Sequence, residues 1–183
     1  MIRIGVFGGE FDPPHLGHLA VLRAARRQLG LDRVIVVPAG VPPHRAPSTT
    51  PADVRLEMAE RAFAGEPGVE VSRIEIDRPG ASYTVDTLEE LAPQGRLFLI
   101  IGADQLAALD SWHDAGRIRE LATLVAAPRD GLAVDPSEAT PLEMPAVDVS
   151  SRAVRDDLAA GRTPDGALDP GVASLIEAHG LYG

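Results

Sequence analysis

The sequence contains no cysteine, which excludes disulfide bonds, thiolate metal sites and cysteine nucleophiles. It also lacks an uninterrupted apolar run long enough to span a membrane. Basic residues are in the minority, because 17 lysines and arginines stand against 27 aspartates and glutamates, and the net charge is -10. This balance argues against a protein that coats nucleic acid or binds membrane surfaces, since both roles need basic patches. A local basic pocket can still exist inside an acidic protein.

The first seven residues are too few, and too polar at their ends, to form a signal peptide, so we expect a cytoplasmic protein. With 183 residues, of which 45% are hydrophobic, the chain has the size and composition of one globular domain over residues 1–183. The sequence leaves the oligomeric state open, and both a monomer and a homo-oligomer are compatible with it.

Apolar segments alternate with amphipathic ones along the chain. We expect strands over 2–7, 34–37, 69–76, 97–101, 124–127 and 146–149. We expect helices over 16–29, 51–63, 83–91, 103–109, 115–121, 154–160 and 172–178, with Thr50 as the cap of the second helix. The segment 129–145 is rich in Pro, Asp, Glu and Gly, which predicts a loop. This order predicts a single-domain, doubly wound α/β fold with a mainly parallel, Rossmann-like sheet.

The segment GGEFDPPHLGH, residues 8–18, joins the first strand to the first helix. Gly8 and Gly9 favour a turn with positive φ and the close approach of a ligand. The helix N-terminus offers free N–H groups and a positive dipole end, which suit a phosphate. His15 and His18 lie three residues apart, so a helix places both rings on one face, and Gly17 between them leaves room for something flat.

Two common phosphate-binding motifs are absent from this segment, which contains neither G-x-G-x-x-G nor the G-K-[ST] end of a Walker loop. Zinc-binding histidines on a helix usually need a third ligand nearby and often sit four residues apart, so we expect no protein-held metal here. The structural alternative is that His15 and His18 only cap and cover the start of the helix.

The segment resembles the G-G-[ST]-F-D-P-x-H-x-G-H signature of the nucleotidylyltransferase superfamily. Further segments, in order and spacing, are similar to the bacterial nicotinate-mononucleotide adenylyltransferases: residues 41–45, 82–84, 101–104, Trp112, 149–151 with Arg155, and 180–182. The resemblance covers the chain from end to end. It implies transfer of AMP from ATP to nicotinate mononucleotide, giving nicotinate adenine dinucleotide and pyrophosphate in NAD biosynthesis. It also implies Mg²⁺ as a cofactor, bound mainly through the ATP phosphates.

The resemblance assigns roles to individual residues. His18 would stabilise charge at the α-phosphate and His15 would hold the triphosphate beside it, as the catalytic pair. The further residues expected at ATP are Gly8, Gly9, Phe11, Gly17, Gly102, Asp104, Ser150, Ser151 and Arg155. The residues expected at the acceptor are His44, Arg45, Ser82, Tyr83, Thr84, Trp112 and Arg129. The acceptor phosphate is already an anion, so the reaction needs positioning and charge stabilisation rather than an activated serine.

Several of these residues have a structural alternative. Ser150 is equally suited to capping a helix, and so are Ser82 and Thr84. A lone tryptophan such as Trp112 is more often part of a core. Residues 42–45 could be a solvated loop.

Three positions depart from the family pattern. Glu10 stands where the signature has serine or threonine, and an acid beside a phosphate is unfavourable unless it points away. Arg152 replaces a hydroxyl residue, and Asp130 follows Arg129 where proline is common. Two other functions therefore stay open. One is the same transfer to another phosphate acceptor, such as nicotinamide mononucleotide or pantetheine phosphate, and the other is a non-catalytic nucleotide-binding module.

Overall fold

A six-stranded parallel sheet with the strand order β3-β2-β1-β4-β5-β6 forms the centre of the computed structural model. The structure describes residues 1–42, 48–129, 131–145 and 149–183. The strands are β1 (Arg3–Gly9), β2 (Arg33–Pro38), β3 (Val69–Val71), β4 (Arg96–Gly102), β5 (Ala122–Ala127) and β6 (Thr140–Pro141). This order reverses between β1 and β4, which is the arrangement of a doubly wound dinucleotide-binding sheet and confirms the predicted fold class.

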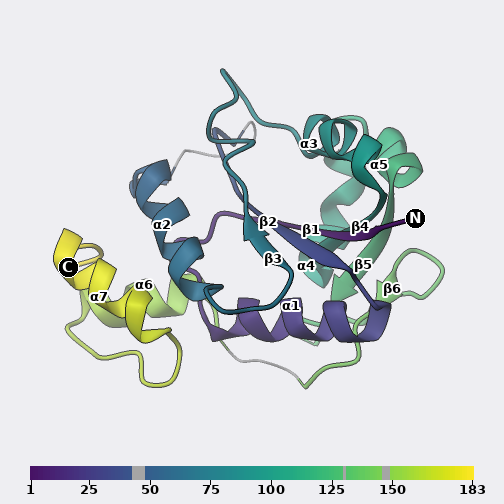
Figure 1. Ribbon diagram of the computed structural model, residues 1–183. Coiled ribbons are helices and arrows are strands. Elements are labelled where there is room, and N and C mark those ends of the chain that lie inside the picture. The colour runs from purple at the N-terminus through teal and green to yellow at the C-terminus, as the bar shows by residue number, and fades with distance from the viewer. Residues whose placement is uncertain (43–47, 130, 146–148) are drawn as a thin grey trace.

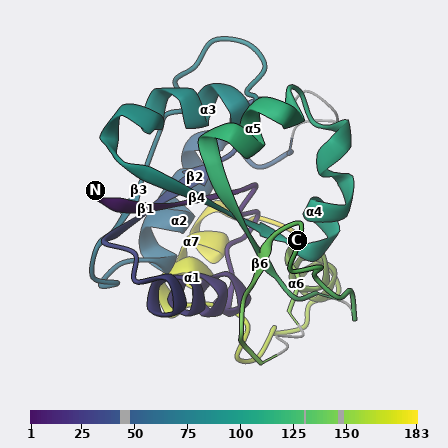
Figure 2. The same cartoon turned by 90° about the vertical axis from the view of Figure 1, so that its right-hand side faces the viewer.

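Helices cover both faces of the sheet. They are α1 (Leu16–Leu29), α2 (Ala52–Ala62), α3 (Thr84–Leu91), α4 (Ala103–Ala108), α5 (Ala115–Leu121), α6 (Ser151–Ala159) and α7 (Pro170–His179), with short 3-10 turns η1 (Ala92–Gln94) and η2 (Leu109–Ser111). Figures 1 and 2 show α1 on one side of the sheet and α3 with α5 on the other. The strands between them are therefore shielded from solvent on both sides.

The central parts of β1, β2, β4 and β5 are apolar because both of their faces are buried. Along β4, Leu97, Leu99 and Ile101 pack toward α3, α4 and α5, whereas Phe98 and Ile100 pack toward α1 and α2. Side chains of a strand alternate between the two faces, so two separate cores form from one continuous apolar run.

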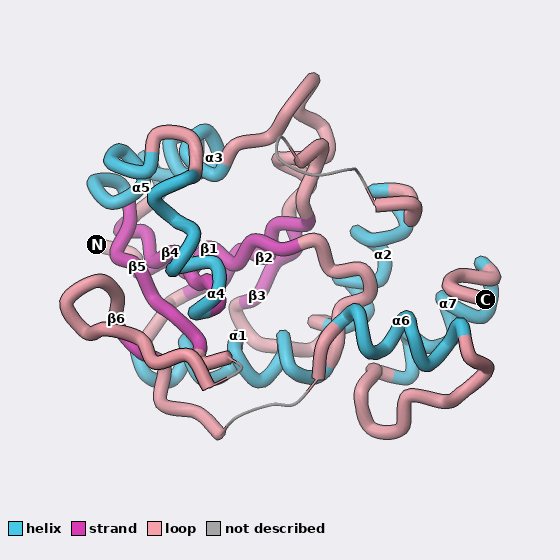
Figure 3. Tube along the Cα trace, turned by 180° about the vertical axis from the view of Figure 1, so that it is seen from behind, coloured by secondary structure: helices cyan, strands magenta, loops and turns pink. Residues whose placement is uncertain are grey.

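The last two helices extend the side that carries α2. Met58 of α2 is fully buried against Val172, Leu175 and Ile176 of α7. Figure 3, seen from behind, shows α6 and α7 beside α2. No helix among the described residues is both long enough and apolar enough to cross a membrane.

The structure corrects several expected boundaries. The strand expected over 69–76 ends at Val71, because the chain then turns and the N–H of Asp77 bonds to the carbonyl of Arg73 at 2.9 Å. The expected loop 129–145 contains the two-residue strand β6, which pairs with β5 and is too short to give an apolar pattern. Helix α2 begins at Ala52 with Pro51, not Thr50, in the capping position.

Two further expectations concern the last third of the chain. The strand expected over 146–149 falls mostly on 146–148, which lie outside the described residues, and Val149 is not part of a strand. Helix α6 starts three residues earlier than expected because the hydroxyl of Ser150 accepts a hydrogen bond from the N–H of Ala153 at 3.1 Å. This bond is the capping role that the sequence offered as an alternative for Ser150.

Candidate active site

A cavity of about 1010 Å³ opens at the carboxyl ends of β1 and β4, where the strand order reverses. Helix α1 leaves β1 toward one face and α4 leaves β4 toward the other, so the chain separates at this point and leaves room for a ligand. The predicted site residues among those lining the cavity are Gly8, Gly9, Phe11, His15, Gly17, His18, Ser82, Tyr83, Thr84, Gly102, Asp104, Trp112, Arg129, Ser150, Ser151 and Arg155. His44 and Arg45 lie outside the described residues.

The two histidines form a stacked pair at the start of α1. Their ring centroids are 3.8 Å apart and their planes are inclined by 26°. His15 is the N-cap residue, and its backbone N–H donates to Nδ1 of His18 at 3.1 Å. Because Nδ1 accepts this bond, the proton of a neutral His18 ring resides on Nε2, which is then a hydrogen-bond donor. The His18 ring also makes an edge-to-face type of contact with the Phe11 ring, with centroids 5.0 Å apart and planes inclined by 67°.

Both imidazoles are held in the neutral form. Burial, and to a lesser degree the charge of Arg129, lower the pKa of His15 to about 4. Desolvation, His15 and Arg129, in that order, lower the pKa of His18 well below its usual value. Nδ1 of His15 is also buried without a hydrogen-bond partner within the described structure. A cationic neighbour and neutral, desolvated donors make this end of the cavity a place where negative charge is stabilised.

The turn that precedes α1 differs from the expected one. Gly8 and Gly9 belong to β1 and do not adopt positive φ; instead Phe11 does, at 50°. A Cβ at Gly9 would lie 3.1 Å from the Phe11 ring, whereas a Cβ at Gly8 would meet nothing within 4 Å. Gly9 therefore makes room for Phe11, and Gly8 leaves the cavity wall open to a ligand.

Three side chains bind the backbone carbonyls of this loop. Arg55 of α2, with 4% of its surface exposed, donates from Nη1 to the carbonyl of Glu10 at 2.9 Å. Arg155 donates from Nη1 to the carbonyl of Asp12 at 2.5 Å, and the hydroxyl of Ser151 donates to the carbonyl of Pro13 at 2.9 Å. Ser151 and Arg155, which the resemblance places at ATP, thus also hold the loop in shape while they line the cavity.

Gly102 and Asp104 lie where β4 passes into α4. The N–H of Gly102 donates to Oε1 of Gln105 at 3.0 Å, and Asp104 is exposed in the first turn of the helix. A Cβ at Gly102 would lie 2.5 Å from Oδ1 of Asp104, a contact that rotation of this exposed side chain relieves. Asp104 lines the cavity directly after the end of β4.

The opposite end of the cavity is aromatic. Trp112 is half-buried, packs against the core that contains α3 and α5, and still lines the cavity, so this residue is part of the core and of the cavity wall at once. Tyr83 and His113 form a ring pair with centroids 4.4 Å apart. Tyr83, rather than Ser82 or Thr84, is the N-cap residue of α3, which excludes the capping alternative for Ser82 and Thr84.

Glu75 organises the backbone beneath this end. Its Oε1 accepts from the hydroxyl of Thr87 at 2.9 Å, and its carbonyl accepts from the hydroxyl of Ser82 at 3.1 Å. The N–H of Gly40 lies 3.4 Å from Oε2, and a Cβ at Gly40 would lie 2.2 Å from the Glu75 carbonyl oxygen. Burial raises the pKa of this carboxyl, although the bonds from Thr87 and Gly40 oppose the shift. The contacts tie the segment after β2 to the start of α3.

Sequence reasoning missed Asp12, Arg55, Glu75 and His113 as parts of the site. Asp12 lies inside the recognised signature, and His113 follows Trp112, so both were within reach of the motifs. Arg55 and Glu75 carry no local signal, because each acts through backbone carbonyls or hydroxyls from distant parts of the chain.

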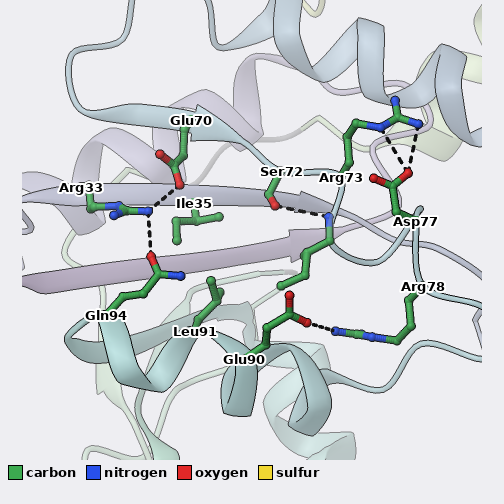
Figure 4. A pocket seen from close by; sticks show the side chains of 11 residues that line it. Arg33, Ile35, Glu70, Ser72, Arg73, Asp77, Arg78, Glu90, Leu91 and Gln94 are labelled. Atoms are coloured by element: carbon green, nitrogen blue, oxygen red, sulfur yellow. Dashed lines mark hydrogen bonds and ion pairs between the residues drawn. The ribbon is translucent and has the colours of Figure 1, made fainter.

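A second hollow of about 650 Å³ lies beside β2, β3 and α3 (Figure 4). Its walls are charged, but the charges are paired with each other: Arg33 with Glu70 at 2.6 Å, and Arg78 with Glu90 at 3.1 Å. Such pairs leave little charge to attract a ligand. The cavity at the strand ends is therefore the candidate active site.

The fold and the cavity together define a nucleotide-binding α/β protein of the doubly wound class. A family model described as Cytidylyltransferase-like matches residues 6–157. The chain belongs to this family, and within it to the nicotinate-nucleotide adenylyltransferases.

Those relatives match over nearly their whole length. A protein of Thermus thermophilus is 47% identical over 99% of this chain and 100% of its own, and one of a Roseiflexus species is 44% identical over 98% and 97%. Both carry the description "Probable nicotinate-nucleotide adenylyltransferase". Plasmodium falciparum nicotinic acid mononucleotide adenylyltransferase, solved in complex with NaAD, shares the fold with a TM-score of 0.80 at 17% identity, covering 100% of this chain and 98% of its own.

Proposed function

We propose that this enzyme transfers the AMP moiety of ATP to nicotinate mononucleotide, forming nicotinate adenine dinucleotide and releasing pyrophosphate. The observation that carries the proposal is the stacked His15–His18 pair at the N-terminus of α1, beside the strand-order reversal. The full-length relatives described by this activity support the same assignment.

The two histidines would act on the phosphates. A phosphate oxygen of the acceptor forms a bond to the α-phosphorus of ATP, and the bond from that phosphorus to the bridging oxygen breaks, with the electron pair leaving on pyrophosphate. Nε2–H of His18 donates to an α-phosphate oxygen as negative charge grows there, and His15 and Arg129 hold the neighbouring oxygens. These groups need no proton removal from the acceptor, which enters as an anion.

The aromatic end of the cavity would hold the acceptor. A pyridinium ring is flat and cationic, so it stacks favourably on the indole of Trp112. Tyr83 and Thr84 line the same cavity and would contact the ring substituent. The hydroxyl of Ser82 donates to the carbonyl of Glu75, and this bond fixes the cavity wall beside the acceptor.

Mg²⁺ would enter with the nucleotide. Within the described residues, no group of three or more His, Asp or Glu side chains could hold a metal by itself. Asp12 is occupied by hydroxyl donors from Ser48 and Tyr182. This donor set fits a cation coordinated by phosphates and water, whose contribution is to neutralise charge on the triphosphate.

Pyrophosphate release tests the proposal. Purified protein with ATP, Mg²⁺ and nicotinate mononucleotide should release pyrophosphate faster than with nicotinamide mononucleotide or pantetheine phosphate. Faster turnover of either of these would overturn the acceptor assignment. No release with any acceptor would leave a nucleotide-binding module.

A matched pair of variants tests the role of His18. Asparagine at this position can still accept the bond from the His15 N–H but has no group at Nε2, whereas glutamine places an amide near Nε2 and loses the acceptor at Nδ1. His18→Asn should lower kcat by roughly 100-fold or more with a small change in melting temperature. His18→Gln should retain more activity than His18→Asn. The opposite ranking would show that His18 serves the loop and not the phosphate.

A further inference from the structure

The loop between β1 and α1 accepts hydrogen bonds through the carboxylate of Asp12 as well as through its backbone carbonyls. Asp12 lies at the centre of the loop with only 6% of its surface exposed. The hydroxyl of Ser48 donates to Oδ2 at 2.5 Å, and the hydroxyl of Tyr182 donates to Oδ1. The chain separation between Asp12 and Tyr182 is 170 residues, so this bond joins the first loop of the chain to the segment after its last helix.

The turn that follows α7 directs the side chain of Tyr182 toward that loop. Helix α7 is capped by Gly180 in the left-handed conformation, with φ of 58°, and the N–H of Leu181 bonds back to the carbonyl of Ile176 at 3.0 Å. Tyr182 itself has a φ of 66°. Leu181 and Tyr182 pack against the cluster of Met58 with α7, so the turn is fixed on helix α2.

The same two helices supply a second connection. Helix α2, on which α7 packs, carries Arg55, and Arg55 binds the carbonyl of Glu10 in the same loop. Burial, and then the bond to Asp12, raise the pKa of Tyr182, so its hydroxyl stays protonated and remains a donor across the neutral range. Arg55 of α2 thus holds the loop at Glu10, and Tyr182, which follows α7, holds it at Asp12.

We propose that Tyr182 is a positioning residue for adenylyl transfer: its hydrogen bond to Asp12 holds the loop that places His15 and His18 at the triphosphate. The inference rests on the proposed function and deepens it, because it assigns a part of the site to the segment that follows α7. Asp12 lies three residues before His15, and Phe11, which precedes Asp12, contacts the His18 ring at 5.0 Å between centroids. A shift of Asp12 therefore moves Phe11 and His15, the two residues whose rings contact the ring of His18.

Removing the hydroxyl should affect ATP more than the acceptor. In Tyr182→Phe the ring keeps its packing, while Oδ1 of Asp12 becomes a buried acceptor without this donor. The value of kcat/KM for ATP should fall roughly 10- to 100-fold, the effect of losing one hydrogen bond to a charged group. KM for nicotinate mononucleotide should stay within about twofold, because Trp112 and Tyr83 lie on other elements.

Two comparisons separate positioning from stability. Leu97→Ala removes a buried side chain at the start of β4, away from α7 and at the other end of the strand from the cavity, so it should lower the melting temperature while kcat/KM for ATP stays within about twofold. In an Asp12→Ala background, Tyr182→Phe should have no further effect on kcat/KM, since its partner is gone. An equal loss in Leu97→Ala, an unchanged kcat/KM in Tyr182→Phe, or additive losses in the double variant would each overturn the proposal.

A failure of the proposed function would look different. If the unsubstituted protein releases no pyrophosphate from ATP and nicotinate mononucleotide, the activity assignment is wrong. The positioning role can then still be measured by calorimetric titration with ATP and Mg²⁺. Tyr182→Phe should bind ATP roughly tenfold or more weakly than both the unsubstituted protein and Leu97→Ala. Equal ATP affinities in the three proteins would overturn the role of Tyr182 by itself.

Discussion

Replacing His15 with asparagine should make the stability of the protein less sensitive to acid. The unfolded chain binds a proton on His15 at its ordinary pKa of 6.5, whereas burial and Arg129 lower the pKa in the folded protein to about 4. Between these two values the unfolded state holds more protons than the folded state. Folding is therefore opposed increasingly as the pH falls from 6.5 toward 4, and the penalty is complete below the lower value.

The size of the effect follows from the two pKa values. The full shift corresponds to about 3 kcal/mol, and at about pH 5 roughly 2 kcal/mol of it is already present. Asparagine has no titrating group, so His15→Asn removes this contribution, whereas that of buried His18 remains in both proteins.

Urea unfolding at about pH 7.5 and about pH 5 measures the difference. The unsubstituted protein should lose roughly 2 kcal/mol more free energy of unfolding between these conditions than His15→Asn does. Equal losses in the two proteins would contradict this expectation, because they would mean that His15 titrates alike when folded and unfolded.

Three further predictions concern the site. Trp112 is the only tryptophan, so nicotinate mononucleotide should quench the intrinsic fluorescence of the protein, and an unchanged spectrum at saturating ligand would argue against stacking on its indole. EDTA should abolish pyrophosphate release and leave the melting temperature of the nucleotide-free protein unchanged; a falling melting temperature would instead indicate a structural metal. Arg55→Met should destabilise the protein by on the order of 3 kcal/mol in urea unfolding, since the buried guanidinium binds the carbonyls of Glu10 and Ala39; a loss below about 1 kcal/mol would be too small for these bonds.

The regular elements were accessible to sequence reasoning where periodicity was strong. Buried strands such as β4, and helices with clear apolar stripes such as α1, match the expected ranges to within one or two residues. β3 and β6 did not, because strands of three and two residues have too few side chains to establish an alternation. The turn after β1 was also misplaced, since two glycines suggested positive φ at the wrong residues.

The site, too, was only partly predictable from the sequence. The order and spacing of residues 8–18 predict a phosphate-binding loop with the two histidine rings side by side, because those relations are local. The rings do stack, although His15 is the extended N-cap residue of α1 and not part of the helix. Glu10 shows the limit of such reasoning. It lines the cavity, and its clearest role is that its backbone carbonyl accepts from Arg55, 45 residues away. A side-chain pattern carries no information about which carbonyl a distant arginine will bind.

Local patterns along the chain were enough to predict the alternation of buried strands and helices, the position of the histidine pair, and the family to which the chain belongs. What holds that pair in place became visible only in the folded molecule: Arg55 and Arg155 bind the carbonyls of the loop, and Tyr182 binds the carboxylate of Asp12. Periodicity depends on neighbours along the chain, whereas these bonds join distant segments. The bonds from Arg155 and Tyr182 span more than a hundred positions, and they exist only because the sheet and the α2–α7 packing bring donor and acceptor together.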